Sequence, residues 1–306
     1  MTISIISHPD CALHEMGSHH PESPARLSAI QDRLIASGLD LVLQHHNAPL
    51  ATREQLCRVH DADYVEKIFH LSPEQGHVEI DPDTSMNPHT LTAALRAAGA
   101  MVLGVDLVMS GKTSAAFCNV RPPGHHAEHN KAMGFCIFNN IAVGAAHALH
   151  AYNLERVAIV DFDVHHGNGT EDIFKGEPKI LLCSIFQHPF YPYTGSNTRS
   201  EHIINVPLSA GTDSKKFREV VDAHWRPKLE EFQPELILIS AGFDAHIEDE
   251  MSGLHLVEED YGWVTTQIKT IADKYAQGRI VSTLEGGYAL SALGRSAAAH
   301  INALLG

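Results

Sequence analysis

Apolar residues fall into short runs along the chain, and each run is bounded by polar or glycine-containing segments. Runs of this length are typical of strands that are buried on both faces of a sheet. The predicted strands are Ile3–Ile6, Ser114–Val120, Val157–Asp163, Ile180–Phe186, His202–Val206, Leu236–Ala241 and Arg279–Leu284.

Helical periodicity fills much of the sequence between these runs. The predicted helices are Thr90–Met109, Asn139–Tyr152, Asp213–Glu231, Val257–Lys274 and Ser291–Leu305. Alternation of strands and helices favours an α/β fold in which a central parallel β-sheet has helices on both faces. No linker-like, low-complexity or repeated segment divides the 306 residues, so we predict a single domain over residues 1–306.

Four of the predicted strands are followed directly by polar residues. In open α/β sheets the functional site lies beyond the carboxyl ends of the strands, so these segments carry more functional weight than others. They are Arg121–His126, His165–Gly169, Gly242–Asp244 and Glu285–Tyr288.

The strand Val157–Asp163 places Asp161, Asp163 and His165 at alternating positions at its end. Same-side residues on a strand stand roughly 6 to 7 Å apart, so Asp163 and His165 can share a metal ion while Asp161 lies deeper. Asp244 follows another apolar strand and completes three ligands, the number typical of a catalytic zinc-type site. The alternatives are that Asp163 and His165 bind backbone groups or a structural cation and that Asp244 is a helix N-cap.

His125 and His126 are adjacent in a loop that contains two prolines and a glycine. Paired imidazoles beside an activated water can transfer protons, although two loop histidines with unrelated partners remain an alternative. Tyr288 follows Gly286 and Gly287, where its phenol can donate to a developing oxyanion. The alternative for Tyr288 is an aromatic ring packed under a loop.

The composition indicates which kinds of binding partner and which cysteine chemistry to expect. The formal net charge of −15 argues against sequence-independent nucleic-acid binding, and an acidic surface would attract cationic substrates. The five cysteines form no Cys-x-x-Cys pair, so we expect reduced thiols that are mostly buried. Most of the 23 histidines stand alone among other residue types, and pairs such as His19–His20 and His45–His46 favour surface or loop positions.

The N-terminus lacks a basic segment followed by a long apolar one, and no run approaches about 18 uninterrupted apolar residues. We therefore expect a soluble, cytoplasmic protein that does not bind membranes. The sequence leaves the oligomeric state open.

Taken together, the polar segments resemble the zinc-dependent histone deacetylase superfamily, which includes bacterial acetylpolyamine amidohydrolases and acetoin-utilisation proteins. The matching motifs occur in the family's order, beginning at His20–Arg26. They are Arg121–His126, Gly134–Cys136, Asp161–Gly169, Ser240–Asp244 and Glu285–Tyr288.

The resemblance implies the arginase/deacetylase fold and a zinc ion held by Asp163, His165 and Asp244. These mixed oxygen and nitrogen ligands also accept Fe²⁺. It further implies that His126 is the general base and acid, and that His125 is an electrostatic partner facing Asp161. Tyr288 would then donate a hydrogen bond to the substrate carbonyl.

Other assignments rest on the resemblance alone. A structural potassium ion is implied beside the zinc, bound by backbone carbonyls and the Ser184 hydroxyl. Asn168 falls where many family members have an acidic partner for the second histidine, and the amide resembles class II enzymes. The remaining implied positions are Asp161, Asp163 and His165 for the potassium carbonyls, Gly134, Phe135, Tyr191 and Met251 for the substrate tunnel, and Arg26 for the acetate exit channel.

These features predict a metal-dependent amidohydrolase that removes acetyl or longer acyl groups from the Nε of lysine in proteins or peptides. An acetylated polyamine remains an alternative substrate: the chain shows no evident entrance insertion, but residues 245–253 add carboxylates near the expected rim. From another class, a catalytically silent acyl-lysine-binding protein is opposed by Tyr288. A binuclear arginase-like ureohydrolase is opposed by the single-metal form of the Asp161–Gly167 motif.

Overall fold

Eight parallel strands form the central sheet of the computed structural model, which describes residues 2–306. The strand order across the sheet is β2-β1-β5-β10-β9-β6-β7-β8. The strands are β1 (Ile3–Ser7), β2 (Leu43–Asn47), β5 (Ala115–Cys118), β6 (Val157–Asp161), β7 (Ile180–Gln187), β8 (Ile203–Leu208), β9 (Leu236–Ala241) and β10 (Ile280–Leu284). This arrangement confirms the predicted α/β class with a parallel sheet.

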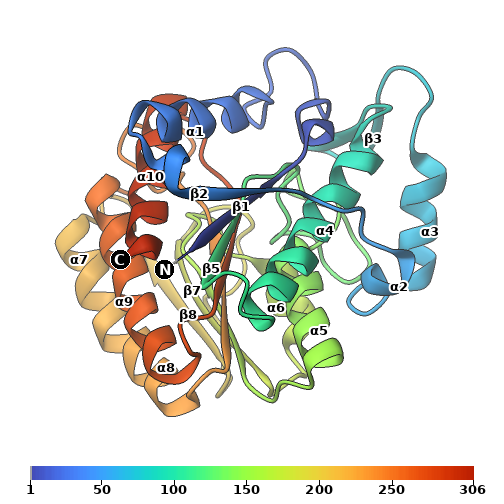
Figure 1. The fold of residues 1–306 in the computed structure, drawn as a ribbon. Helices are drawn as coiled ribbons and strands as arrows, with labels where there is room; N and C mark the ends of the chain where they lie inside the picture. The colour runs from blue at the N-terminus through green and yellow to red at the C-terminus, as the bar shows by residue number, and fades with distance from the viewer. Residues whose placement is uncertain (1) are drawn as a thin grey trace.

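Helices cover both faces of the sheet (Figure 1). One layer contains α1 (Ala25–Ala36), α9 (Glu258–Tyr275) and α10 (Leu290–Leu305), which pack on one another. The opposite layer contains α4 (Thr90–Met109), against β1, β5 and β10, and α5 (Asn140–Tyr152), against β6 and β9. Every residue of β6, β9 and β10 is buried between the two layers, which explains why these strands are apolar without alternation.

Helix α4 is the one helix among residues 2–306 that is long and apolar enough to span a membrane. Its most apolar 18-residue window is 72% buried inside the protein. The apolar surface of α4 faces the sheet and α5, which is the position of a core helix.

Several elements escaped the sequence-based prediction. Strand β2 has the sequence LQHHN and lies at the sheet edge, with only its first residue buried. His45 and His46 therefore lie at the surface as expected, but on a strand and not in a loop. The other unpredicted elements are α1, α2 (Arg53–Leu56), α3 (Ala62–Leu71), α6 (Asn168–Phe174) and the antiparallel hairpin of β3 (Val78–Asp81) and β4 (Thr84–Met86).

Two predicted boundaries were also wrong. The single helix expected over 213–231 consists of α7 (Ser214–Val220), a π-helical turn (Val221–Trp225) and α8 (Arg226–Phe232). Strand β6 ends at Asp161, so Asp163 and His165 lie in the loop that follows it. Asp163 and His165 therefore do not share one face of a strand, and the loop after β6 positions them instead.

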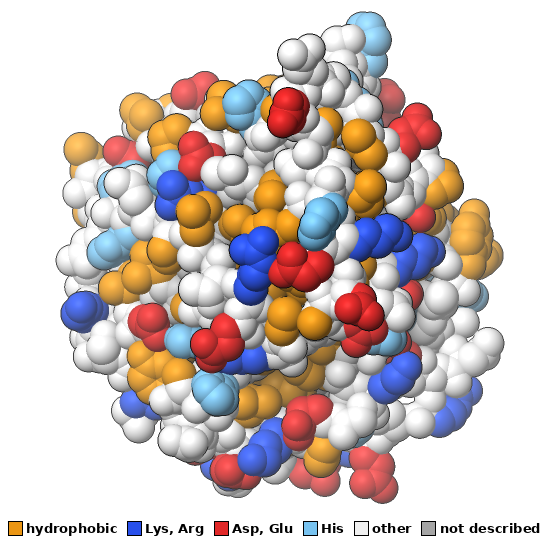
Figure 2. Space-filling view, turned by 90° about the vertical axis from the view of Figure 1, so that its right-hand side faces the viewer, with side chains coloured by type: hydrophobic (Ala, Val, Ile, Leu, Met, Phe, Trp, Pro, Cys, Tyr) orange, Lys and Arg blue, Asp and Glu red, His pale blue; other side chains and the backbone are white. Residues whose placement is uncertain are grey.

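Charged side chains of both signs intermingle over the face that carries α2 and α3. Figure 2 shows this face, with acidic, basic and histidine side chains dispersed among one another. Arg53 pairs with Glu66 at 2.7 Å and Arg58 with Glu54 at 2.8 Å. On this face the acidic excess of the chain is not gathered into a continuous negative area.

The contact between α4 and the segment after β2 depends on Gly99. A Cβ atom at this position would lie 2.0 Å from the carbonyl oxygen of Pro49 and 2.9 Å from the amide nitrogen of Ala51. The Ala51 N–H also donates to the Leu95 carbonyl at 2.9 Å. Backbone therefore packs on backbone here, and no side chain can move aside to make room.

We predict that Gly99→Ala lowers the free energy of unfolding by about 1–3 kcal/mol, the usual effect of overpacking. Helix propensity acts in the opposite direction, because alanine alone would stabilise the helix by about 1 kcal/mol. Urea denaturation measures the difference. Gly176→Ala is the control, since nothing lies within 4 Å of its Cβ position. Unchanged or increased stability of Gly99→Ala would contradict the packing argument.

Candidate metal-dependent active site

Asp163, His165 and Asp244 converge at the carboxyl edge of β6 and β9. All three residues are buried, and one ligand atom from each lies within 4.8 Å of the others. His165 Nδ1 is 3.0 Å from Asp163 Oδ1 and 3.2 Å from Asp244 Oδ2. Within the described residues, Asp244 Oδ2 makes no hydrogen bond although it is buried. An unsatisfied buried carboxylate oxygen is the donor that a metal ion would complete.

Two glycines allow the backbone to approach these carboxylates. A Cβ on Gly286 would lie 2.0 Å from Asp244 Oδ2, and a Cβ on Gly242 would lie 2.1 Å from Asp163 Oδ2. The Gly286 N–H donates to Asp163 Oδ2 at 2.8 Å, and the Val164 N–H donates to Asp244 Oδ1 at 2.9 Å. The His165 N–H donates to the other oxygen of Asp163 at 2.8 Å, so backbone donors hold both carboxylates while Asp244 Oδ2 is left without one among the described residues.

The electrostatics of the cluster favour a positive charge between the carboxylates. Burial and the neighbouring charge of Asp163 raise the pKa of Asp244 to about 6. Burial lowers the pKa of His165, but the neighbouring carboxylates of Asp163 and Asp244 raise it to about 9 overall. Two carboxylates and an imidazole fit a divalent ion that keeps open positions for substrate. The residues present therefore fit the metal that the sequence predicts.

His125 and His126 lie side by side, with ring centroids 4.1 Å apart, and have different partners. His125 Nδ1 lies 2.9 Å from Asp161 Oδ2, and His126 Nδ1 lies 2.7 Å from Asn168 Oδ1. Burial opposes the protonation of His125, but Asp163 and Asp161 raise its pKa to about 10. Burial, His125 and His165 hold the pKa of His126 well below its usual value. The surroundings therefore shift the pKa values of the two imidazoles in opposite directions.

Glu285 supports the histidine loop and was noted in the sequence only as part of a motif. Its Oε2 accepts hydrogen bonds from the backbone N–H groups of Gly124 at 2.7 Å and His125 at 3.1 Å, and its Oε1 accepts one from Ser240 at 3.1 Å. Burial raises the pKa of Glu285 to about 7. A buried acidic residue directly after a strand was the signal that could have identified this role.

Tyr288 is held from two sides. Asp249 Oδ2 accepts the Tyr288 N–H at 2.6 Å, and Arg26 donates to the Gly287 carbonyl at 2.6 Å while its guanidinium lies 5.0 Å from the Tyr288 ring centroid. Burial raises the pKa of Tyr288 well above its usual value, despite the opposing charge of Arg26. The phenol therefore keeps its proton and can donate it in a hydrogen bond. Arg26 braces this turn, and its place in an exit channel stays a prediction.

A cavity of about 250 Å³ lies beside the metal cluster. Its three histidines, His125, His126 and His165, are buried, whereas its Phe and Tyr residues are half-buried. All four tunnel residues expected from the sequence line it, namely Gly134, Phe135, Tyr191 and Met251. The sequence analysis missed two others: Phe190, which stacks on His165 at 5.3 Å, and Asp83, from the loop between β3 and β4.

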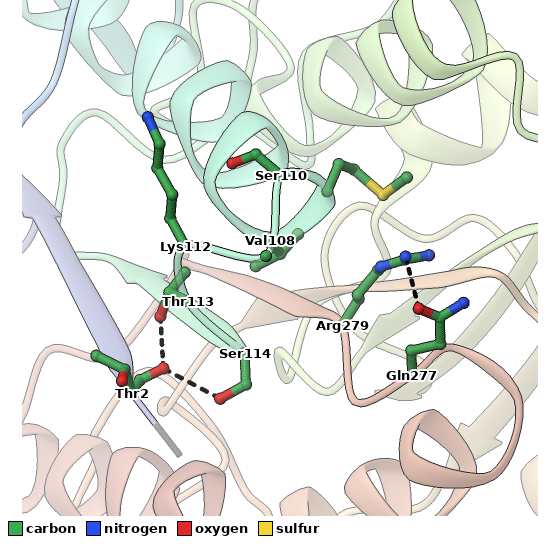
Figure 3. Close-up of a pocket in the computed structure, with 10 residues that line it drawn as sticks. Thr2, Val108, Ser110, Lys112, Thr113, Ser114, Gln277 and Arg279 are labelled. Carbon is green, nitrogen blue, oxygen red and sulfur yellow. Dashed lines mark hydrogen bonds between the residues drawn. The ribbon is translucent and has the colours of Figure 1, made fainter.

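A larger cavity of about 450 Å³ lies at the opposite side of the sheet, at the amino ends of the strands (Figure 3). Thr2, Ser114 and Arg279 each precede a strand, and Ser114 Oγ donates to the Thr2 carbonyl at 3.0 Å. Figure 3 shows Lys112 and Arg279 pointing away from one another, with Arg279 bound to Gln277 at 2.8 Å. Parallel sheets place their sites at the carboxyl edge, so the smaller cavity at the metal cluster is the candidate site.

The loops of the eight-stranded parallel sheet carry a buried Asp-His-Asp cluster, two histidines and a tyrosine. This combination is typical of a metal-dependent hydrolase. Residues 20–304 match the family model described as "Histone deacetylase domain", and the chain belongs to this family. It is accordingly a hydrolase of the deacetylase class with an Asp-His-Asp metal site.

Named relatives agree with this assignment. The chain is 36% identical to the histone deacetylase-like amidohydrolase of Pseudomonas aeruginosa, over 88% of this chain and 72% of that protein. It is 34% identical to a probable deacetylase of Archaeoglobus fulgidus, over 95% and 82% of the two chains. The crystal structure of the HDA15 HD domain matches with a TM-score of 0.93 at 33% identity, covering 99% of this chain and 88% of that one.

Metal binding gives the first test of the site. We predict that Asp244→Ala loses the stoichiometric metal ion, because two ligands remain where three are needed. Asp244→Asn keeps an oxygen for the Val164 N–H and should still bind the ion much more weakly, since it lacks the charge. Elemental analysis of the dialysed protein measures the content, and the rise in melting temperature on adding metal gives a second readout.

Asp172→Ala is the control for these variants, because Asp172 pairs with Lys175 outside the cluster. It should retain the ion and the metal-dependent rise in melting temperature. A stoichiometric ion in folded Asp244→Ala would remove Asp244 from the ligand set.

Proposed function

We propose that this protein is a zinc-dependent deacylase that hydrolyses the Nε-acyl amide of lysine in proteins or peptides. The observation that carries the proposal is the narrow cavity with an aromatic outer part, formed by Phe135, Phe190 and Tyr191, and a polar buried end at the metal cluster. An acyl-lysine side chain has an apolar methylene arm that fits the aromatic outer part and an amide that fits the polar buried end. Tyr288 and both histidines also line the cavity, which opposes the alternative of a catalytically silent acyl-lysine-binding protein.

In the proposed reaction each side chain of the site has a separate role. A bound zinc ion supplies Lewis-acid polarisation of the acyl carbonyl and lowers the pKa of water. His126, the neutral imidazole, accepts the proton of the attacking water and later delivers it to the leaving amine. Tyr288 donates a hydrogen bond to the oxyanion, and the charged His125, held by Asp161, stabilises negative charge nearby. The products are a carboxylate and the protonated amine, because the new carboxylic acid gives up the second proton of the water at neutral pH.

We further propose the structural potassium site. Ser184 lies opposite Asp161 in the pairing of β7 with β6, and its buried hydroxyl has no hydrogen-bond partner among the described residues. An unpartnered oxygen beside the backbone carbonyls of residues 161–165 suits a monovalent cation. A cytoplasmic location and action as a single catalytic domain also belong to the proposal, with Fe²⁺ kept as the alternative to zinc. These points rest on the sequence arguments alone.

The acidic segment after Asp244 gives less support to a polyamine than its sequence suggests. Asp249 is buried and accepts the N–H groups of Tyr288 and Ala289, and Glu248 pairs with Arg295 at 2.6 Å. Asp83, however, lines the cavity as a half-buried carboxylate and could bind a second ammonium group. Acetylpolyamine deacetylation is therefore kept as the second candidate on the strength of Asp83.

We predict that Tyr288→Phe lowers kcat on an acetyl-lysine peptide by about 10²-fold or more, the usual effect of removing an oxyanion donor. The phenylalanine ring preserves the packing against Phe135, 6.1 Å away between centroids, and against Arg26. Metal content should remain that of the wild type. Near-normal turnover would exclude Tyr288 from the reaction.

Substrate class is tested by comparing kcat/KM for acetyl-lysine peptides, longer acyl-lysine peptides and acetylated polyamines with the zinc-loaded protein. We expect a preference for acyl-lysine peptides of about 10²-fold. Asp83→Asn should weaken activity on the cationic polyamine more than on a peptide, because it removes a charge that attracts the second amine. A reversed preference would make acetylated polyamines the substrate class.

A further inference from the structure

Asn168 links His126 to a third side chain that the reaction above does not use. The Asn168 Oδ1 lies 2.7 Å from His126 Nδ1, and its Nδ2 donates to Glu128 Oε1 at 2.8 Å. Met133 Sδ at 3.3 Å and the His126 carbonyl oxygen at 3.5 Å are longer contacts that also accept from the same Nδ2 group. His126, Asn168 and Glu128 thus form a continuous chain that runs from the cavity to the half-buried Glu128.

The hydrogen-bonded series His126–Asn168–Glu128 has a direction because the side chains at its two ends differ in hydrogen-bonding capacity. An ionised glutamate only accepts hydrogen bonds, whereas an asparagine amide donates from one side and accepts on the other. The carboxylate of Glu128 therefore requires that Nδ2 of Asn168 faces it. Oδ1 must then face His126, and the ring nitrogen it contacts must carry a hydrogen.

We propose that Glu128 is a positioning residue that fixes the Asn168 amide orientation and thereby the Nδ1–H tautomer of His126, which leaves Nε2 free to accept a proton. With the amide reversed, Nδ2 would donate to His126 Nδ1 and the neutral imidazole would carry its hydrogen on Nε2. That tautomer cannot act as a base through Nε2. An aspartate in place of Asn168 would not face this choice, because both of its oxygens are acceptors.

The backbone segments that carry Asn168 and Glu128 are held together closely enough to keep these side chains in place. A Cβ on Gly169 would lie 2.2 Å from the Ala127 carbonyl oxygen, so the start of α6 packs directly on the histidine loop. The Thr170 N–H donates to the His125 carbonyl at 3.1 Å, and the Glu128 carbonyl lies 3.0 Å from His60 Nδ1. Asn168 and Glu128 are therefore carried by segments whose separation is fixed by backbone contact.

The direct test is the tautomer of His126, measured by ¹⁵N NMR on the zinc-loaded full chain, with the resonance assigned by its loss in His126→Gln. The expected wild-type state is protonated Nδ1 with unprotonated Nε2. Glu128→Gln keeps the side-chain shape but can also donate to the amide, so a substantial fraction of His126 should shift to the Nε2–H form. Glu177→Gln is the control and should leave the tautomer unchanged, because Glu177 is a half-buried glutamate just beyond the end of α6.

Activity gives the second readout and rests on the proposed deacylase function. Glu128→Gln should lower kcat by about tenfold, part of the contribution of a general base, with KM within about twofold. In the Asn168→Asp background the same substitution should cause no further loss, since the aspartate fixes the tautomer by itself. A protein that hydrolyses none of the tested amides would refute the deacylase proposal, while the NMR result would still decide the role of Glu128.

Two outcomes would overturn the inference. One is a wild-type His126 that carries its hydrogen on Nε2. The other is an unchanged tautomer in Glu128→Gln together with a loss of kcat that is equal in the wild-type and Asn168→Asp backgrounds, which would mean that Glu128 only stabilises the loop.

Discussion

Burial of negative charge at one sheet edge is the constraint on which the rest of this structure depends. Asp161, Asp163, Asp244 and Glu285 are all buried at the carboxyl ends of β6, β9 and β10. A buried carboxylate is tolerated only where hydrogen-bond donors or opposite charge surround it. The glycines of the connecting loops supply the first of these, because they let backbone N–H groups reach the oxygens. The remaining charge is what gives the site its affinity for cations.

A second buried cluster stabilises its carboxylate with opposite charge instead of backbone donors. Glu22 is completely buried, and Arg121 and Arg26 surround it with charged donors. Burial alone would raise its pKa, but Arg121 and the other neighbours hold the pKa of Glu22 well below its usual value. This cluster is complete within the protein and braces the loops on which Tyr288 stands, through Arg26. The Asp-His-Asp cluster differs because the carboxylate of Asp244 has an oxygen without a hydrogen-bond partner among the described residues. That difference separates a structural ion pair from a metal site.

Much of the fold and of the site was predictable because burial and chemistry leave marks in the sequence. Continuous apolar runs identify the inner strands, and the polar groups that follow them identify Asp163, Asp244 and Tyr288. The edge strand β2 was missed because its exposed residues resemble a loop. Asp83 and Phe190 were missed for another reason: they enter the cavity from loops that follow β3 and β7, and no local pattern records which loop bends over the sheet edge.

A neutral amide, Asn168, stands between His126 and the carboxylate of Glu128. The sequence places Asn168 where many family members have an acidic partner for the second histidine. The structure places the Glu128 carboxylate on the far side of that amide, so a negative group is present but acts through a hydrogen bond rather than by direct contact. An aspartate beside His126 would raise the basicity of the imidazole and favour a protonated state. A relayed carboxylate orients the imidazole while leaving it neutral, and a neutral imidazole is the state that can accept a proton from water.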